Sequence, residues 1–270
     1  MPELPEVETI ARGLHKRIAG DQIDSVWIGK KREPLKSPAA EIARTLEQAR
    51  IERVQRVGKH IVLSLESPKD ASKHQWVVHL GMTGRMLIAS AELEIAPHTH
   101  LIARLVSGRE IRFVDPRRFG RLEVRHDGFD GPGTEPLTVG LEEFSALFQG
   151  RKAPIKGALL NQKLLHGVGN IYADESLFRA GVRPRRRAGS LTKAELKKLH
   201  GGLQRVLKEA IAAGGSSVSD YVDAEGEEGF FQLKHRVYGR GGEPCRVCKT
   251  PITKIVVAGR GTHYCSKCQK

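Results

Sequence analysis

The sequence lacks any long hydrophobic run. No apolar stretch approaches the roughly 20 residues that a membrane-spanning helix needs. The opening residues, Met1 to Glu6, are acidic and proline-rich, whereas a signal peptide is basic and then apolar. Internal repeats and extended low-complexity tracts are also absent. We therefore expect a cytoplasmic protein, and its content of 39% hydrophobic and 28% charged residues permits an ordinary packed core.

Cysteine is scarce and confined to one end of the chain. The 4 cysteines form two C-x-x-C pairs, Cys245 with Cys248 and Cys265 with Cys268, separated by 16 residues. Two disulfides or free thiols are the alternatives, but clustered cysteines in a cytosolic protein more often bind metal. Four thiolates complete the tetrahedron of one zinc ion and leave no open position, which predicts a structural zinc. His263 is an unnecessary fifth ligand and is expected at the surface or beside the ligands.

Negative charge is in short supply. The chain has 45 Lys and Arg against 31 Asp and Glu, a formal net charge of +14, and a pI near 9.8. This balance indicates a polyanionic partner, and the lack of a spanning segment favours nucleic acid over a membrane surface. Residues 234–270 hold nine Lys and Arg against one acid, Glu243. We expect this zinc hairpin to lie on a phosphate backbone, with Arg260 at its tip reaching a groove or a phosphate.

Hydrophobic periodicity divides the chain into a β-rich and a helical part. Residues 5–19 have the three- and four-residue apolar spacing of an amphipathic helix, and residues 22–125 contain short β-branched runs typical of a β-sandwich or flattened barrel. A Gly/Pro-rich stretch, 128–136, is predicted to be a linker. Residues 214–229 are small, polar and acidic, which predicts a loop. Helices are expected at 141–148, 154–165, 171–180 and 192–213.

Two of these helices flank the turn Gly167-Val168-Gly169-Asn170. Glycines allow a tight turn, and the start of the second helix presents N–H groups to an anion. Asn170 can add an amide donor. Such turns also occur in ordinary helical domains, but the nearby Lys156 and the basic run 183–187 favour DNA.

Five motifs, in order along the chain, together resemble the formamidopyrimidine-DNA glycosylase family. They are Pro2 to Glu8, His79 to Gly84, Asp115 to Gly120, Gly169 to Glu175 and Val237 to Arg240, followed by the four-cysteine finger. The resemblance implies an α+β fold. An N-terminal β-sandwich with an N-terminal helix precedes a helix-two-turn-helix domain and a zinc-finger β-hairpin. We assign residues 1–130 to the sandwich, 131–232 to the helical domain with its lesion-binding loop, and 233–270 to the finger.

The resemblance also implies a bifunctional DNA glycosylase and AP lyase for oxidised purines such as 8-oxoguanine and formamidopyrimidines. Removal of Met1 would make Pro2 a secondary amine, and an α-amino pKa near 8 leaves a useful neutral fraction. Attack on the sugar C1′ gives an iminium, and β,δ-elimination then cuts the strand. Glu3 is the expected proton donor to the ribose ring oxygen. Glu6 resembles a supporting carboxylate.

Contacts to the damaged strand follow from the same resemblance. Lys59 and Arg260 are expected beside the reacting nucleotide, and Lys156 and Asn170 on phosphates near it. His100 is also placed among the DNA contacts. The resemblance also implies a loop that closes over the extruded nucleotide. This loop consists of Ser216, Ser217, Val218, Ser219, Asp220 and Tyr221. Asp220 stands where some relatives carry Thr, so its side-chain contacts are open.

An enzyme that acts on a base in duplex DNA must extrude the nucleotide and fill the space it leaves. Met82, Arg117 and Phe119 resemble the family's void-filling residues, with Phe119 as the wedge and Arg117 bonded to the orphaned base. Isolated strand Met and Phe are more often core residues. The adjacent Arg117-Arg118 favours exposure and DNA contact here.

Two other functions stay open. The endonuclease VIII-like sister family acts on oxidised pyrimidines, but usually has Gly where this chain has Leu4. A non-catalytic zinc-ribbon DNA-binding protein is the second alternative, if Met1 is retained. The expected partner is double-stranded DNA carrying an oxidised purine, preferably opposite cytosine. We expect a monomer that binds it on the bacterial nucleoid.

Overall fold

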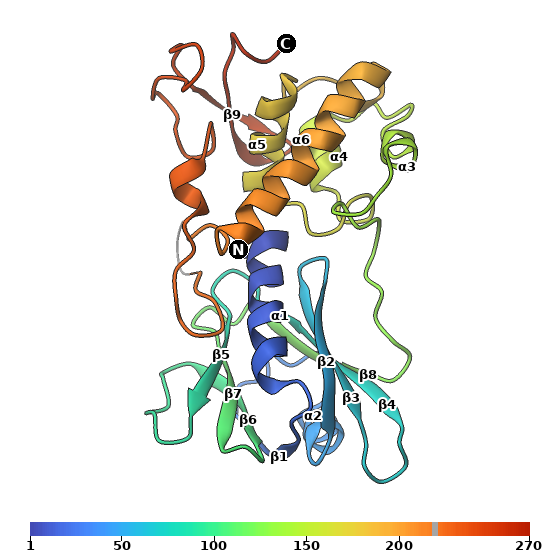
Figure 1. The fold of residues 1–270 in the computed structure, drawn as a ribbon, viewed down its shortest axis with the longest axis vertical. Coiled ribbons are helices and arrows are strands. Elements are labelled where there is room, and N and C mark those ends of the chain that lie inside the picture. The colour runs from blue at the N-terminus through green and yellow to red at the C-terminus, as the bar shows by residue number, and fades with distance from the viewer. Residues whose placement is uncertain (218–220) are drawn as a thin grey trace. The chain divides into compact units, whose positions relative to one another are not determined.

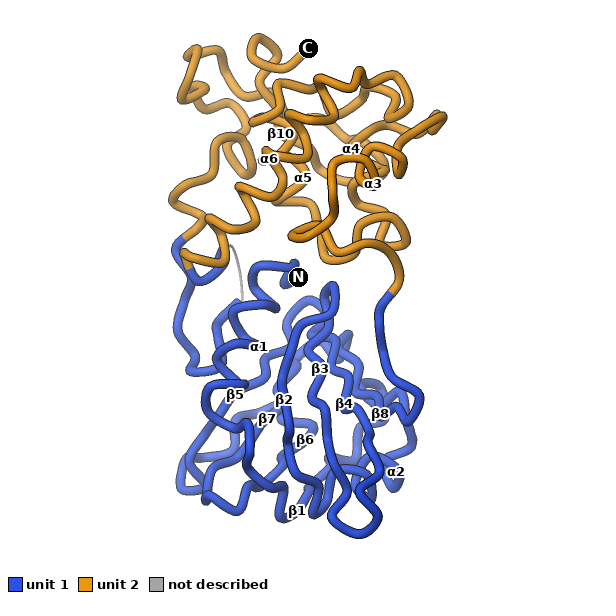
Figure 2. Tube along the Cα trace, turned by 45° about the vertical axis from the view of Figure 1, so that its right-hand side comes forward, with its two compact units in different colours: residues 1–131, 214–230 blue, residues 132–213, 231–270 orange. Residues whose placement is uncertain are grey.

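The computed structural model describes residues 1–217 and 221–270, so the predicted lesion contacts Val218, Ser219 and Asp220 lie outside the described residues. The chain forms two compact units (Figure 2). One comprises residues 1–131 and 214–230, and the other residues 132–213 and 231–270. The division into three domains stays a prediction, since these units group the segment 214–230 with the β-rich part and the finger with the helices.

The first unit is a β-sandwich of two four-stranded antiparallel sheets (Figure 1). The first sheet has the order β2 (Arg50–Val57), β3 (His60–Glu66), β4 (Lys73–His79), β8 (Arg121–Arg125). The second has the order β1 (Ile23–Ile28), β6 (Thr99–Leu105), β7 (Arg109–Val114), β5 (Arg85–Ser90). Two helices, α1 (Leu4–Ile18) and α2 (Ala39–Leu46), complete the unit.

Side chains alternate between the two faces of each strand, and one face of each strand packs into a common core. Ile61 of β3 pairs with Val78 of β4, and Leu63 with Trp76, and all four side chains are buried. The apolar stripe of α1 enters the same core, as its period predicts. The sequence did not predict β2 or α2, because β2 carries charges on its outer face and α2 buries only Ile42 and Leu46.

The second unit contains four helices among its described elements and a two-stranded hairpin. They are α3 (Leu141–Ala146), α4 (Ile155–Leu160), α5 (Asn170–Ala180), α6 (Lys193–Ala212), β9 (Thr253–Val257) and β10 (Arg260–Tyr264), with short 3-10 turns at Ala188–Ser190 and Phe231–Lys234. α6 packs along α5 (Figure 1). No helix in the described part of the chain is long and apolar enough to cross a membrane.

The predicted helix 154–165 stops early, at Leu160. Asn161 has an extended backbone, and its Oδ1 accepts the N–H of Lys163 at 3.0 Å. The side chain of Gln162 then bonds both Gly167 and Val168. Local side-chain bonds of this kind compete with helix propagation. They give the turn before α5 its shape.

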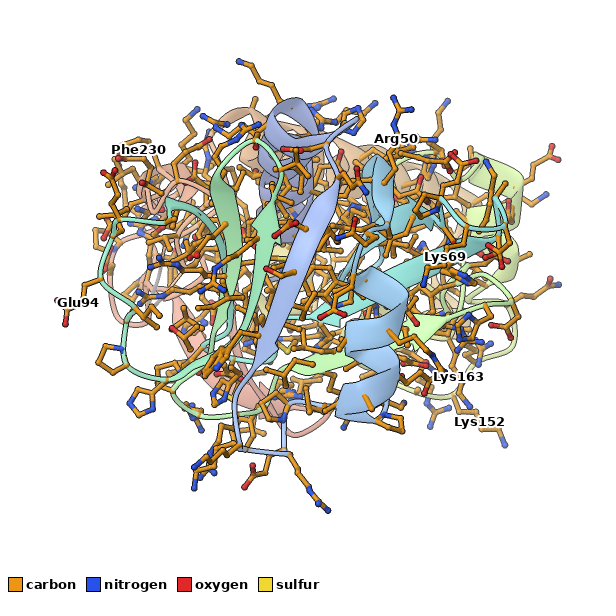
Figure 3. All side chains as sticks on the ribbon, turned by 90° about the horizontal axis from the view of Figure 1, so that it is seen from below. Arg50, Lys69, Glu94, Lys152, Lys163 and Phe230 are labelled. Atoms are coloured by element: carbon orange, nitrogen blue, oxygen red, sulfur yellow. The ribbon has the colours of Figure 1, made fainter. Side chains whose placement is uncertain are left out.

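Charged side chains cover the outside of both units. Arg50 and Lys69 of the first unit are exposed, as are Lys152 and Lys163 of the second (Figure 3). The excess of positive charge is therefore distributed over the surface. A binding site has to be distinguished from a solvated face by the arrangement of its side chains, because charge alone does not do so.

The start of α6 provides a test of local helix capping. The Thr192 side chain accepts the N–H of Glu195, and the Glu195 carboxylate accepts the N–H of Thr192 at 2.8 Å. Thr192→Ala should lower the free energy of unfolding by about 1 kcal/mol, measured by urea denaturation with circular dichroism. Thr138→Ala, in an exposed turn, is the control and should change it by less than about 0.5 kcal/mol. Equal losses in both variants would contradict the cap.

Candidate active site and DNA interface

The first turn of α1 is held by the carboxylate of Glu6. Glu6 Oε2 accepts the backbone N–H of Glu3 at 2.8 Å, and Glu6 Oε1 accepts the N–H of Ser216, 210 residues further on, at 2.8 Å. Pro2 is buried and Glu3 is 4% exposed, whereas Met1 is 48% exposed. Glu6 therefore positions the predicted nucleophile and proton donor, a role that the sequence alone left undefined.

The segment that begins at Gly214 packs closely against the Glu6 side chain. Gly215 has a φ of 86°, and a Cβ there would lie 3.0 Å from Glu6 Cγ. The hydroxyl of Tyr221 donates to the carbonyl of Gly214 at 2.9 Å. Burial, and then the nearby Glu6, raises the pKa of Tyr221. The Tyr221 side chain is therefore a buried anchor of the loop, and the predicted contact of its backbone with the lesion stays a prediction.

Ser216 and Ser217 are anchored within the first unit as well. Ser217 Oγ donates to the carbonyl of Tyr221 at 3.0 Å and accepts the N–H of Gly229 at 2.9 Å. The N–H of Ser216 is bonded to Glu6, so it reaches another acceptor only by leaving that carboxylate. The described ends of the predicted lesion loop form a fixed base.

Lys59 lies in the turn between β2 and β3 and is 8% exposed. Arg56 supports this turn, since its Nη1 donates to the carbonyl of Gly58 at 3.3 Å. Glu8 of α1 accepts from Arg56 Nε at 2.8 Å. The helix that carries Pro2 and Glu3 is thus tied to the turn that carries Lys59. The sequence alone does not reveal this link, because Glu8 and Arg56 share no motif.

Two loops of the first unit meet at Gly81. Its φ is 63°, and a Cβ there would lie 2.5 Å from the carbonyl carbon of Phe119. Next to this contact, Met82 is 42% and Phe119 is 53% exposed, and the Arg117 guanidinium lies 4.9 Å from the Phe119 ring centroid. The structure brings these three predicted residues together. Arg118 pairs instead with an exposed carboxylate, Glu33, at 2.8 Å.

Asp115 shapes the loop that carries Arg117 and is completely buried. Its Oδ1 accepts from Thr83 Oγ1 at 2.6 Å, and its Oδ2 accepts the N–H of Gly120 at 2.8 Å. His100 Nε2 donates to the Asp115 carbonyl at 2.9 Å. His100 is only 4% exposed, and its predicted DNA contact stays a prediction. The ring supports the loop.

In the second unit, Lys156 is enclosed by protein groups. It is 0% exposed, and its ammonium lies 2.7 Å from Asp174 Oδ1, 2.7 Å from Thr262 Oγ1 and 3.0 Å from the Gly261 carbonyl. Its predicted contact with DNA stays a prediction. Lys156 joins α4, α5 and the zinc hairpin.

Asn170 bonds the hairpin carbonyl next to Arg260 in the chain. Asn170, the first residue of α5, donates from Nδ2 to the Gly261 carbonyl at 3.0 Å. Ala258 and Gly259, with φ of 50° and 71°, form the two-residue turn before β10. Arg260 follows this turn. It is exposed, and its side chain has no ion pair within residues 1–217 and 221–270. Its side chain is therefore open to solvent.

The four cysteines fit one tetrahedral metal ion. All four Sγ atoms lie within 4.8 Å of one another, and the thiols are free. The Cys248–Cys265 and Cys245–Cys268 sulfur distances, 3.3 and 3.9 Å, are far too long for disulfides. Zinc–sulfur bonds of about 2.3 Å bring sulfurs to such separations.

His263 is not a fifth ligand and is not at the surface. It is 9% exposed, and its backbone N–H donates to Asp174 Oδ2 at 2.8 Å. Its ring packs edge-on against Tyr238. Glu175, the next residue of α5, accepts the backbone N–H groups of Arg236, Val237 and Tyr238. Burial raises the pKa of Glu175. Two successive acids thus hold the finger and the segment before it.

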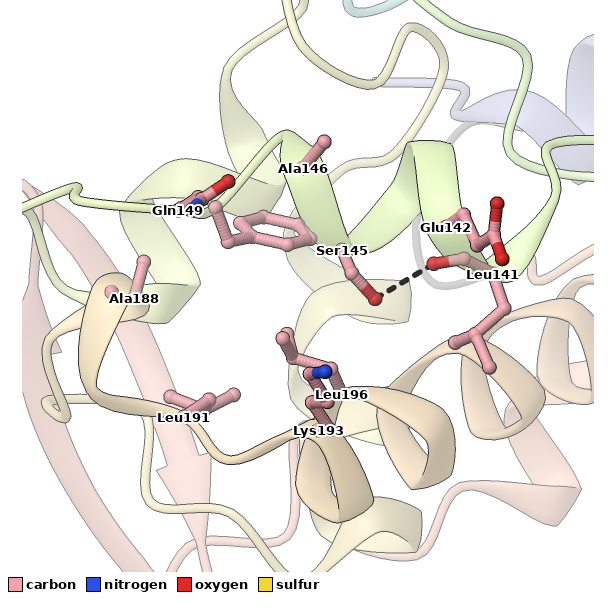
Figure 4. A pocket seen from close by; sticks show the side chains of 11 residues that line it. Leu141, Glu142, Ser145, Ala146, Gln149, Ala188, Leu191, Lys193 and Leu196 are labelled. Carbon is pink, nitrogen blue, oxygen red and sulfur yellow. Dashed lines mark hydrogen bonds between the residues drawn. The ribbon is translucent and has the colours of Figure 1, made fainter.

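A pocket of about 500 Å³ lies between α3 and the start of α6 (Figure 4). Its walls are mainly apolar, with Leu141, Leu191 and Leu196 among them, and Glu142 and Lys193 add one charge of each sign. None of the described site residues lines it. The pocket is separate from the candidate site.

Comparison with known sequences identifies the family. The model described as the formamidopyrimidine-DNA glycosylase N-terminal domain matches residues 1–122, the corresponding H2TH domain matches 132–222, and the zinc finger found in FPG and IleRS matches 242–270. The formamidopyrimidine-DNA glycosylase of Desulfitobacterium hafniense is 43% identical over 281 residues, 100% of both chains. The chain belongs to the formamidopyrimidine-DNA glycosylase family.

Other members of the formamidopyrimidine-DNA glycosylase family agree along the full length. The Solibacter usitatus protein is 42% identical over 277 residues, with 100% of both chains covered. The crystal structure of the MutM (FPG) protein from Thermus thermophilus has a TM-score of 0.87 at 40% identity, covering 99% of this chain and 98% of that one. A Lactococcus lactis FPG mutant in complex with Fapy-dG-containing DNA has a TM-score of 0.90 at 32% identity, covering 100% of both.

These matches confirm the predicted family and the α+β fold class. Together with the four-cysteine cluster, the zinc-finger match also confirms one structural zinc ion. As a member of this family the chain is a DNA glycosylase.

The buried pair Lys156–Asp174 should be strongly coupled. Lys156→Met or Asp174→Leu alone leaves an unpaired buried charge and should lower the free energy of unfolding by about 3–5 kcal/mol. The double variant should lose clearly less than the sum of the two, as measured by denaturant titration of the zinc-loaded protein. Glu209→Gln breaks the partly exposed Arg179–Glu209 pair and is the control, with a loss below about 1 kcal/mol. Additive losses in the double variant would refute the coupling.

Proposed function

We propose that this glycosylase excises oxidised purines from duplex DNA through the amine of Pro2 and then cleaves the strand as an AP lyase. The observation that carries the proposal is the clamp at the start of α1. There, Glu6 holds the Glu3 N–H and the Ser216 N–H on one carboxylate. A nucleophile must be held in place to gain from proximity, and the second residue of a chain is otherwise among its least ordered parts.

The reaction needs Met1 to be removed, since Pro2 in the full chain has an amide nitrogen. The freed secondary amine attacks C1′, the bond from C1′ to the base breaks, and the departing base takes a proton. Glu3 gives a proton to the ring oxygen, which opens the sugar and leaves an iminium at C1′. Loss of a C2′ proton then expels the 3′ phosphate, and loss of a C4′ proton expels the 5′ phosphate.

The proposed DNA contacts differ from those expected from the sequence at Lys156. Arg260 and Asn170 on the second unit remain the proposed phosphate contacts, together with Lys59 on the first. Lys156 becomes a positioning residue for Arg260 and Asn170 because its ammonium is enclosed. Met82, Arg117 and Phe119 are proposed to fill the space of the extruded nucleotide, and their shared exposure supports this.

The substrate proposal is an oxidised purine opposite cytosine, bound by a monomer on the bacterial nucleoid. The Lactococcus lactis relatives were crystallised with Fapy-dG DNA, with abasic-site DNA and with DNA containing an oxidised pyrimidine. The pyrimidine alternative is therefore tested directly, by comparing cleavage of duplexes that contain 8-oxoguanine or an oxidised thymine. Faster cleavage at the thymine lesion would favour the sister activity.

Borohydride trapping tests Pro2 as the nucleophile. With an 8-oxoguanine duplex, reduction should give a covalent protein–DNA adduct, and peptide mapping should place the DNA on Pro2. Retaining Met1, or adding an N-terminal tag, should abolish both trapping and cleavage because the proline nitrogen becomes an amide. Glu3→Gln should keep the amine but lose most base excision, with some cleavage left at pre-formed abasic sites. Adducts on Lys59, or trapping that survives the tag, would overturn the mechanism.

Arg117 should set the preference for the opposite base. A guanidinium can donate to both O2 and N3 of an orphaned cytosine, whereas adenine presents a donor at its pairing edge. Arg117→Ala should bring the ratio of single-turnover cleavage rates, lesion–cytosine over lesion–adenine, close to one. Arg118→Ala is the matched control and should keep the wild-type ratio, since Arg118 pairs with Glu33. An unchanged ratio in the Arg117 variant would count against the assignment.

A further inference from the structure

A second concave surface of the helical unit carries four cations and no acid. We call it the α5–α6 groove. It has a volume of about 890 Å³ and lies between the end of α5, the middle of α6 and the edge of the zinc finger. Arg179, Lys197, Lys198 and Arg205 contribute the cations. Arg179 is paired with Glu209 at 2.8 Å. The other three are exposed and have no ion pair in the described part of the chain.

The groove differs from an ordinary solvated charged face in being concave and partly apolar. Phe178 and Val247 line it, and Val247 is 64% exposed. The volume is in the range of ligand-binding clefts. The pocket of Figure 4, by contrast, has one charge of each sign among its lining residues.

Gly201 is a second unusual feature of this groove. It lies with Gly202 in the interior of the 20-residue helix α6, where glycine is unfavourable relative to alanine. Gly202 faces α5, where a Cβ would be in ordinary contact, 3.4 Å, with the Ser176 carbonyl. At Gly201 a Cβ would meet nothing within 4 Å. Glycine at this position keeps the floor of the groove open for an outside group to approach α6.

The groove also lies away from the DNA-directed end of α5. Asn170 begins the helix, whereas the groove contains Ala180 and Gly181 at its end (Figure 1). At 1.5 Å per residue the two ends are about 15 Å apart. The groove combines its cations with the apolar side chains of Phe178 and Val247, a mixture that a chain of phosphates alone does not match. A peptide can supply both carboxylates and an apolar side chain.

We propose that the α5–α6 groove binds an acidic peptide segment of a partner protein, with carboxylates on Lys197, Lys198 and Arg205 and an apolar side chain against Phe178 and Val247. This surface uses neither Pro2 nor the DNA contacts proposed above. It therefore stands independently of the glycosylase mechanism. Binding there would recruit the enzyme while leaving Asn170 and Arg260 available to DNA.

Fluorescence anisotropy with a labelled synthetic peptide, Glu-Asp-Asp-Glu-Leu-Phe-Asp-Glu, tests the proposal on the full zinc-loaded chain. The peptide should bind, and replacing its Leu and Phe by Ser should weaken binding at least tenfold. Lys197→Glu combined with Lys198→Glu should weaken it at least tenfold. Lys152→Glu combined with Lys163→Glu is the matched control, because both lysines are exposed outside the groove, and it should change the affinity less than threefold.

Gly201→Leu separates binding from folding. It adds a strong helix former and fills the groove, so the melting temperature should rise by about 2–4 °C while peptide binding falls at least tenfold. Cleavage of lesion DNA should persist in this variant. The proposal is overturned if the wild-type protein does not bind the peptide, or if the groove and control variants lose affinity equally. It is also overturned if a duplex without a lesion displaces the peptide and the groove variants lose DNA affinity instead, since the groove would then be a nucleic-acid surface.

Discussion

A buried ion pair between Lys156 and Asp174 organises the half of the molecule that carries the zinc hairpin. Neither charge is exposed, so each depends on the other and on its hydrogen-bond partners to offset the loss of water. The Gly261 carbonyl accepts from both Lys156 and Asn170, and Arg260 is its neighbour in the chain. The exposed guanidinium and the start of α5 are consequently placed by one buried charge cluster.

In the first unit a buried carboxylate likewise organises the N-terminus, but its partners are backbone N–H groups. The Glu6 carboxylate accepts N–H groups from both the first turn of α1 and the segment after α6. Asp115 does the same for the loop of Arg117. In each place a buried acid fixes a short segment through its backbone N–H groups. Exposed groups that would contact DNA are therefore mounted on rigid, internally bonded loops.

Local signals predicted much of this arrangement. The spacing of the cysteines, the stripe of α1 and the Thr192–Glu195 box are all contained within short windows, and the structure contains each of them. The burial of Lys156 could not be predicted, because it depends on Asp174, Gly261 and Thr262, which are distant in sequence. Without those partners, a lysine near a basic run is predicted to be exposed. The burial of His100 and Tyr221 could not be predicted for the same reason, since their partners are backbone carbonyls brought near only by tertiary folding.

The zinc site couples redox chemistry to the distant end of α5. Cys248 and Cys268 are half-buried, whereas Cys245 and Cys265 are buried, so a peroxide reaches the thiolates of the first two more readily. Oxidation of these thiolates would release the metal and remove the support of the hairpin that supplies two of the acceptors of Lys156. The buried ammonium would then lose the Gly261 carbonyl and the Thr262 hydroxyl together. Damage to the zinc site would therefore extend into the interior of the second unit.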